Sequence, residues 1–210
     1  CVAANYQSNA RITLNTVGSV DVVWEDPRVA IATPDIYAQR LSFAGVPQWT
    51  ANGVVVCNAA GAQTRPVVCA TPYNNGIWVA WQDARTDAGD IYAQLINSSG
   101  VPTLAANGFV THNVATDLQA LPEIQSDGST GAELVWIDNR LALSADLYAQ
   151  RVNVAGGRLW GISGVIVCAA TGAASTPSIT TDGLGGMLVA WNDNRTGYSD
   201  IYMRRVDATG

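Results

Sequence analysis

The sequence predicts an all-β protein built from four tandem repeats, and two observations carry this prediction. A Trp-x-Asp-x-Arg segment occurs four times, with its Trp residues spaced by 57, 55 and 55 positions. Each segment is followed by Asp-Ile-Tyr or Asp-Leu-Tyr, and no part of the chain combines helical apolar spacing with capping residues. Offsets repeated this closely indicate tandem structural units.

Each repeat contains the same five residue types in the same order: a Trp, an Asp, an Arg, a second Asp and a Tyr. They are Trp24, Asp26, Arg28, Asp35, Tyr37; Trp81, Asp83, Arg85, Asp90, Tyr92; Trp136, Asp138, Arg140, Asp146, Tyr148; and Trp191, Asp193, Arg195, Asp200, Tyr202. Ten residues after the second Asp comes a glycine, at Gly45, Gly100, Gly156 and Gly210. The repeats begin at Cys1, Cys57, His112 and Cys168, which divides a single repeat domain, 1–210, into 1–56, 57–111, 112–167 and 168–210.

We expect four short strands in each repeat. The first strand follows a proline or its equivalent, as in Pro177-Ser178-Ile179-Thr180. An Asp-Gly or Asn-Gly pair, as at Asp182-Gly183, predicts the hairpin turn after it. The second strand carries the Trp, and the third begins at Asp-Ile-Tyr. The fourth ends at the Cys or His position, as in Gly164-Val165-Ile166-Val167-Cys168.

Tandem four-stranded units of roughly 40–55 residues are typical of β-propeller blades, which bury their faces by stacking on one another. The strand Ile77-Trp78-Val79-Ala80-Trp81 is apolar on both faces and suits such stacking. A β-solenoid and a row of small sandwiches are the competing architectures. Because the fourth repeat stops at Gly210, the last blade is expected to lack its fourth strand. A longer protein, a ring closed by an incomplete blade, or a strand donated by another chain would each account for this.

The charge composition excludes some classes of partner. Only 13% of the residues are charged, all 11 basic residues are Arg, and the net charge is −6 with a pI near 4.5. This acidity argues against nucleic acid and against anionic lipid as partners. No apolar run approaches the roughly 18 residues that a membrane span needs.

The repeated Asp and Arg residues favour a structural role. An Arg fork can hold both Asp residues of its repeat and so fix the turn between the second and third strands. Clustered Asp oxygens also suit calcium, and the best trio for it is Asp83, Asp87 and Asp90. Arg85 lies within this trio and would repel a cation, so the structural role is preferred.

The set Cys1, Cys57, His112 and Cys168 is a candidate zinc site if equivalent residues converge. These residues end the outer strand of their blades, where equivalent positions lie far apart, so buried packing is preferred. Disulfides remain an alternative, with Cys69 outside the repeat register. A first-position Cys1 also fits lipidation of a mature N-terminus, although the repeat register already explains it.

The other aromatic residues divide into two groups. Trp49 and Trp160 match Leu104, which predicts a repeated apolar contact. Trp78 and Tyr198 break the repeat pattern and are expected to be exposed.

Residues for catalysis are few. The chain contains one His and three Glu, namely Glu25, Glu123 and Glu133, and most Asp residues belong to the repeated hairpins. The remaining carboxylates form no recognisable pair of the kind that glycosidases use. No phosphate loop, Gly-x-Ser-x-Gly or His-Glu-x-x-His motif occurs. We therefore expect no catalytic residue and no enzyme.

The Trp-x-Asp-x-Arg segment followed by Asp-Ile-Tyr-Ala-Gln-Arg resembles the tandem repeats of large secreted or cell-surface bacterial proteins described as β-propellers. Val56-Cys57-Asn58-Ala59 fits the resemblance, and Tyr202-Met203-Arg204 departs from it. The resemblance covers essentially the whole chain and implies an exported protein, extracellular or on the cell surface. It implies no shared catalytic motif.

The function expected from these observations is a non-catalytic structural or adhesive module of a surface or filamentous assembly. Its partners would be other copies of itself or neighbouring domains. A glycan- or peptide-binding propeller, with calcium as the only cofactor considered, is the first alternative. A fragment of a sialidase-like glycoside hydrolase is the second.

Overall fold

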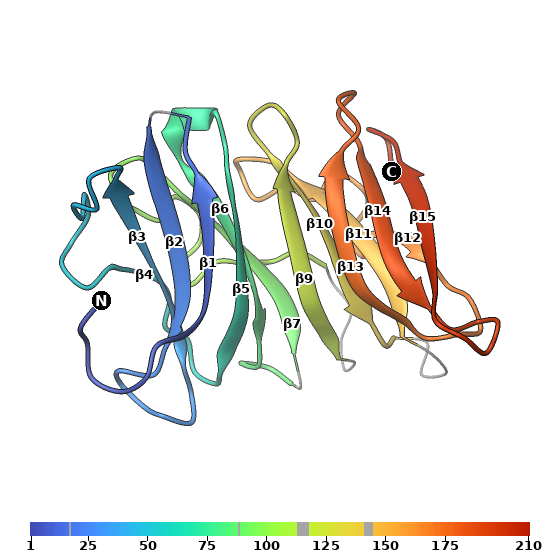
Figure 1. Cartoon of the computed structure of the whole chain (residues 1–210), viewed down its shortest axis with the longest axis horizontal. Helices are drawn as coiled ribbons and strands as arrows, with labels where there is room; N and C mark the ends of the chain where they lie inside the picture. The colour runs from blue at the N-terminus through green and yellow to red at the C-terminus, as the bar shows by residue number, and fades with distance from the viewer. Residues whose placement is uncertain (17, 88, 113–117, 141–144) are drawn as a thin grey trace.

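The structure, a computed structural model, describes residues 1–16, 18–87, 89–112, 118–140 and 145–210. Its strands form four antiparallel sheets, three with four strands and one with three. This is the predicted propeller fold of four blades with a short last blade, and Figure 1 shows the blades side by side in chain order. Within the described residues, no helix has the length and apolar character that a membrane crossing requires.

The blades follow the chain without crossovers. Blade 1 contains β1 (Ser8–Leu14), β2 (Ser19–Asp26), β3 (Asp35–Ser42) and β4 (Val54–Cys57). Blade 2 contains β5 (Gln63–Ala70), β6 (Ile77–Asp83), β7 (Asp90–Ile96) and β8 (Phe109–Val110), with the short 3-10 helix η1 (Tyr73–Asn75) before β6. Blade 3 contains β9 (Gln119–Ser126), β10 (Ala132–Asp138), β11 (Asp146–Val152) and β12 (Val165–Cys168). Blade 4 contains β13 (Ala174–Thr181), β14 (Met187–Asp193) and β15 (Asp200–Val206).

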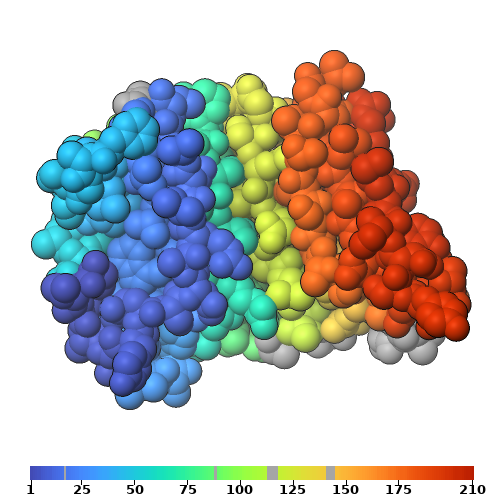
Figure 2. All heavy atoms as spheres, viewed as in Figure 1, coloured from blue at the N-terminus to red at the C-terminus, as the bar shows by residue number. Residues whose placement is uncertain are grey.

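The first strand of each blade is the inner one. Strand β5 contacts β1 and β9, and β9 contacts β13, so the four first strands lie next to one another. They form one continuous face of the molecule in Figures 1 and 2. The axis of the propeller runs along this face, and side chains of different blades can meet there.

The core lies between the blades. Three clusters of buried apolar side chains each join one blade to the next, as when Val23 and Trp49 of blade 1 pack with Val79 and Trp81 of blade 2. The strands have apolar residues on both faces because each inner blade is covered on both sides. Trp78, which was expected to be exposed, is fully buried in the cluster between blades 2 and 3. It donates a hydrogen bond from Nε1 to the Thr130 carbonyl (3.1 Å).

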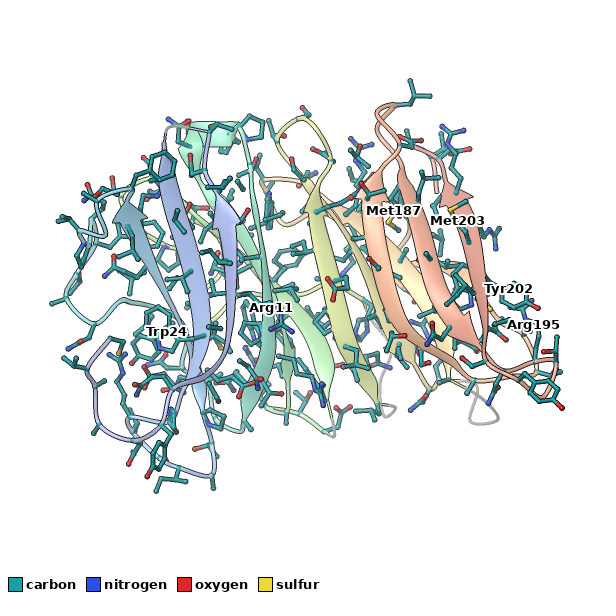
Figure 3. The ribbon with its side chains drawn as sticks, in the orientation of Figure 1. Arg11, Trp24, Met187, Arg195, Tyr202 and Met203 are labelled. Carbon is teal, nitrogen blue, oxygen red and sulfur yellow. The ribbon has the colours of Figure 1, made fainter. Side chains whose placement is uncertain are left out.

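The end blades have uncovered faces. Ile201 and Met203 of blade 4 are 73% and 70% exposed, whereas the matching residues of blade 3, Leu147 and Ala149, are fully buried. Met203 lies at the outer end of the row of blades in Figure 3. Tyr198, on the loop before β15, is exposed as predicted.

Candidate functional site at the propeller axis

Every inner strand contains a β-bulge at the same place. The pairing with the second strand shifts between Ser8 and Arg11 in blade 1, and the other three blades shift at matching positions. At each bulge one residue that is not glycine has a left-handed backbone, with φ between 46° and 54°: Asn9, Arg65, Leu121 and Thr176. Such backbone conformations are costly for residues with side chains, and they concentrate at functional sites.

The four bulges surround one small cavity, which we call the axial cavity. It has a volume of about 210 Å³, and all four bulge residues line it. Arg11 of β1 and Glu123 of β9, each two positions after a bulge residue, add charged groups to the wall. The repeats therefore bring unlike residues together at a single point on the axis.

Glu123 is the one carboxylate that lines the axial cavity among the described residues. Its side chain is half-buried, and burial raises its pKa, while the nearby Arg11 guanidinium works in the opposite direction. A carboxyl group of this kind stays protonated to a higher pH than an exposed one, which suits a proton donor.

Arg11 and Arg65 supply positive charge around the cavity. Both side chains are exposed, and neither forms a salt bridge with any described residue. Figure 3 shows Arg11 on the inner face, over the first strands. An Arg whose guanidinium forms no salt bridge keeps donors available for hydroxyl or anionic groups of a ligand.

Glu25 of β2 holds the cavity wall in place. Its carboxylate accepts hydrogen bonds from the Asn9 side-chain amide (2.8 Å), the Arg65 backbone N–H (2.6 Å) and the Ser8 hydroxyl (3.1 Å). These bonds join the bulges of blades 1 and 2. The matching positions in the other blades are Gln82, Ile137 and Asn192, so only blade 1 has this carboxylate.

The repeated Trp, Asp, Arg and Tyr residues form a different arrangement, which we call the clamp. In every blade the Trp Nε1 donates to the first Asp at 2.7–3.1 Å, and the Arg donates to the same Asp at 2.5–2.6 Å. The Arg also lies over the repeat Tyr ring, 3.6–4.0 Å from its centre. These three contacts fix the turn between the second and third strands.

The second Asp of the repeat lies outside the clamp, contrary to the predicted double grip by the Arg. Asp90 and Asp200 instead accept hydrogen bonds from Thr86 (2.7 Å) and Thr196 (2.6 Å). The Arg donates its remaining hydrogen bonds to other groups; Arg85, for example, also donates to the Asn107 carbonyl (2.8 Å).

The structure does not bring Asp83, Asp87 and Asp90 together as a calcium site. Asp83 is committed to its clamp, Asp87 accepts a hydrogen bond from the Gly89 N–H (2.9 Å), and Asp90 accepts from Thr86. Among the described residues, no group of three or more His, Cys, Asp and Glu side chains is placed to hold a metal ion.

The residues of the zinc candidate set are separated, one to each clamp. Cys1 contacts Asp26, Cys57 contacts Asp83, and Cys168 contacts Asp193, at sulfur–oxygen distances of 3.5–3.8 Å. His112 stacks on Trp136 of the third clamp, with ring centres 5.4 Å apart. Cys57, His112 and Cys168 each lie at or just after the end of the outer strand of one blade and pack on the clamp of the next, because the outer strand leads directly to the following blade. Cys1 packs on the first clamp in the same way.

All four cysteines are free thiols in the structure, so none of the disulfide pairings considered above is formed. Cys57, Cys69 and Cys168 are buried. Burial raises the pKa of the Cys57 thiol to about 12, which makes it a poor nucleophile near neutral pH. The axial cavity, which contains no cysteine, is therefore the better candidate for chemistry.

Comparison with known proteins gives structural neighbours only. No protein-family model matches the chain, and no curated protein matches it. Among solved structures, a Hadza microbial sialidase matches with a TM-score of 0.62 and 11% identity, over 97% of this chain and 45% of the sialidase chain. The chain therefore spans less than half the length of that neighbour.

Two further neighbours are described as an endo-arabinase and an alpha-L-arabinofuranosidase. An endo-arabinase from Bacteroides thetaiotaomicron has a TM-score of 0.54 and 10% identity, over 94% of this chain and 74% of its own. The catalytic domain of a Coprinopsis cinerea GH62 alpha-L-arabinofuranosidase has a TM-score of 0.54 and 11% identity, over 95% and 63%. At such low identity these matches show the fold.

These neighbours correct the function expected from the sequence. A non-catalytic structural or adhesive module, and with it the absence of an enzyme, was the expectation. The neighbours with this fold are instead described as glycoside-processing enzymes, so that expectation is contradicted. Sequence spacing did not single out Glu123 among the unpaired carboxylates, because its place at the cavity depends on four bulges that are far apart in the sequence.

Proposed function

We propose that the chain provides four blades of a glycoside-processing propeller whose carbohydrate site is the axial cavity. The observation that carries the proposal is the meeting of four bulges around Glu123, a half-buried carboxyl group with a raised pKa. In this proposal Glu123 donates a proton to the oxygen of a glycosidic bond as the bond between that oxygen and the anomeric carbon breaks. Water then adds to the anomeric carbon and returns a proton to Glu123. General-acid catalysis of this kind commonly contributes about 10²–10⁴-fold in rate.

Arg11 and Arg65 bind the sugar in this proposal. Their guanidinium groups lie at the cavity and form no salt bridge with any described residue. Glu25 is a positioning residue, because it holds Asn9 and Arg65 rather than lining the cavity. The glycan is the partner that we propose for the protein, and an extracellular location is consistent with the resemblance of its repeats to exported proteins.

The direct test is hydrolysis of a panel of fluorogenic glycosides by the wild type, Glu123→Gln and Asp200→Asn. Asp200 is an exposed carboxylate at the start of β15, away from the inner strands, and serves as the control. We expect Glu123→Gln to lose at least about 100-fold in kcat and Asp200→Asn to keep wild-type activity. Equal activity of all three proteins would remove Glu123 from the mechanism.

A pH profile tests the proton-donor role separately. Because Glu123 must be protonated to act, activity is lost as the pH rises through its raised pKa. Arg11 works to lower this pKa, so Arg11→Gln is expected to move the alkaline limb of the profile to higher pH. A limb that stays in place would show that Arg11 does not influence the catalytic acid.

A further inference from the structure

Neighbouring blades are joined by an aromatic contact that occurs at two of the three junctions. At the junction of blades 1 and 2, Trp49 donates from Nε1 to the Ser98 carbonyl (3.0 Å). Its ring lies directly on Gly100, where an added Cβ would come within 2.8 Å of the indole. The glycine at this position is required because any side chain would occupy the place of the ring.

The junction of blades 3 and 4 repeats this contact with different residues. Trp160 donates from Nε1 to the Ala208 carbonyl (3.2 Å), and its ring lies on Gly210, again 2.8 Å from an added Cβ. Between blades 2 and 3, Leu104 takes the place of the Trp, and an added Cβ at Gly156 would lie 3.7 Å from the Phe109 ring and 3.9 Å from Leu104. Each junction therefore places an apolar side chain of one blade on the repeat glycine of the next.

Blade 1 has a comparable surface on its other side, and no other blade of the structure covers it. An added Cβ at Gly45, the counterpart of Gly100, would meet no atom within 4 Å. Val22 and Leu41 line an apolar hollow of about 700 Å³ on this face, while their counterparts Val79 and Ile96 are fully buried under blade 1. We call Gly45 and this hollow the blade 1 recess.

Residues 1–2 make the same contacts at the blade 1 recess as residues 57–58 make where blade 1 passes to blade 2. Arg85 donates to the Cys57 sulfur (3.2 Å), and Arg28 reaches the Cys1 sulfur in the same way (3.5 Å). The Asn58 N–H donates to the Asn107 side chain, and the Val2 N–H donates to that of Asn52, the counterpart of Asn107. Residues 1–2 thus follow the path by which a fourth strand passes to the next blade.

We propose that the blade 1 recess binds a further blade of the same repeat, which places an aromatic side chain on Gly45 as Trp49 lies on Gly100. The wall of the recess is largely apolar, with Val22, Trp24, Leu41 and Pro47 among its residues. An apolar wall suits the apolar face of another blade. The inference is independent of the activity proposed for the axial cavity.

The experiment adds one repeat to the chain and follows the thiol of Cys1. Residues 2–56 are placed directly before Cys1, so that Val56 precedes Cys1 as it precedes Cys57 in the natural sequence. Cys1 is the only exposed thiol of the original chain, whereas Cys57 in the matching position is buried. We expect the added blade to slow labelling of Cys1 by a thiol reagent at least tenfold.

The matched control is the same extended chain with Trp49→Ala in the added copy only. The proposal requires this control to label faster than the intact extension, since the aromatic side chain is what occupies the blade 1 recess. Equal labelling of both extended chains, whether fast or slow, would overturn the proposal. Slow labelling of the original chain that appears only at high protein concentration would also overturn it, because the occupant would then be a second copy.

A second measurement does not depend on the extended chain folding. N-acetyl-tryptophan amide at millimolar concentration is added to the original chain, and backbone NMR signals are followed. We expect shifts at Gly45 and Leu41 in the wild type and smaller shifts in Gly45→Ala, whose methyl group would occupy the place of the ring. Absence of shifts at these residues in the wild type would contradict the proposed contact.

Discussion

His112 should make the protein sensitive to mild acid, and the size of the effect can be worked out from the structure. The imidazole is fully buried, stacks on Trp136 and accepts a hydrogen bond through Nε2 from the Ile91 N–H (3.2 Å). Burial lowers the pKa of His112 to about 4, with Arg140 and Arg158 adding to the decrease and Asp138 opposing it. The neutral form is therefore the one that the folded protein holds.

The sign of the effect follows from comparing the folded and unfolded chains. An exposed imidazole titrates near pH 6.5, so between about pH 6.5 and 4 the unfolded chain binds a proton that the folded chain does not. Stability is thus fully present above pH 6.5 and falls as the pH falls through this window. The full difference corresponds to about 3 kcal/mol, and about 2.5 kcal/mol of it is lost by pH 4.5.

The assay is urea unfolding of the wild type and His112→Cys at pH 7.5 and 4.5. Cysteine is the residue that the other repeats have at this position, so it fits the junction. Other titrating groups are common to both proteins, and the wild type should lose about 2.5 kcal/mol more than the variant between the two pH values. Equal losses would refute the account of a buried, neutral His112.

Two further predictions concern the repeat itself, and thermal or urea unfolding checks both. An added Cβ at Gly53 would lie 2.5 Å from an indole atom, whereas Gly45 has open space, and both have a positive φ. Gly53→Ala should therefore cost at least 2 kcal/mol more than Gly45→Ala, taking roughly 1–2 kcal/mol for the backbone in each; similar losses would contradict the close packing. Asp138→Asn removes the charge facing Arg140 in a buried clamp and should cost about 3 kcal/mol, while the exposed Asp200→Asn should change stability by less than about 0.5 kcal/mol. A mild effect of Asp138→Asn would show that the clamp contributes little to stability.

The blades could be predicted from sequence because the repeated Trp, Asp and Tyr positions mark the ends of the strands in every repeat. Trp24 and Tyr37 lie opposite each other in the β2–β3 pair, and Asp26 lies opposite Asp35 at its end, as the repeated offsets required. The clamp was predicted less accurately. Its Arg forms a salt bridge with the first Asp and stacks on the Tyr ring. The strand register places the Tyr under the guanidinium and leaves the second Asp beside the turn.

The axial cavity could not be predicted in this way, because it depends on backbone conformation and on differences between repeats. A left-handed φ at Leu121 or Thr176 is unusual for these residue types and cannot be read from hydrophobic pattern. One signal was present: a proline follows the bulge residue in three of the four repeats, at Pro66, Pro122 and Pro177. Residues that break the repeat on this strand, such as Glu123, were the ones to examine.

The central claim, that Glu123 is the protonated group of a carbohydrate site, is tested most directly by carboxyl NMR. The chain contains only three Glu residues, so selective labelling with carboxyl-13C glutamate gives three side-chain signals, which Glu123→Gln assigns. The account predicts that the Glu123 signal titrates above the ordinary range of a glutamate and shifts when an oligosaccharide substrate or its product is added. A Glu123 signal that titrates like an exposed glutamate and does not respond to any glycan of the panel would contradict it.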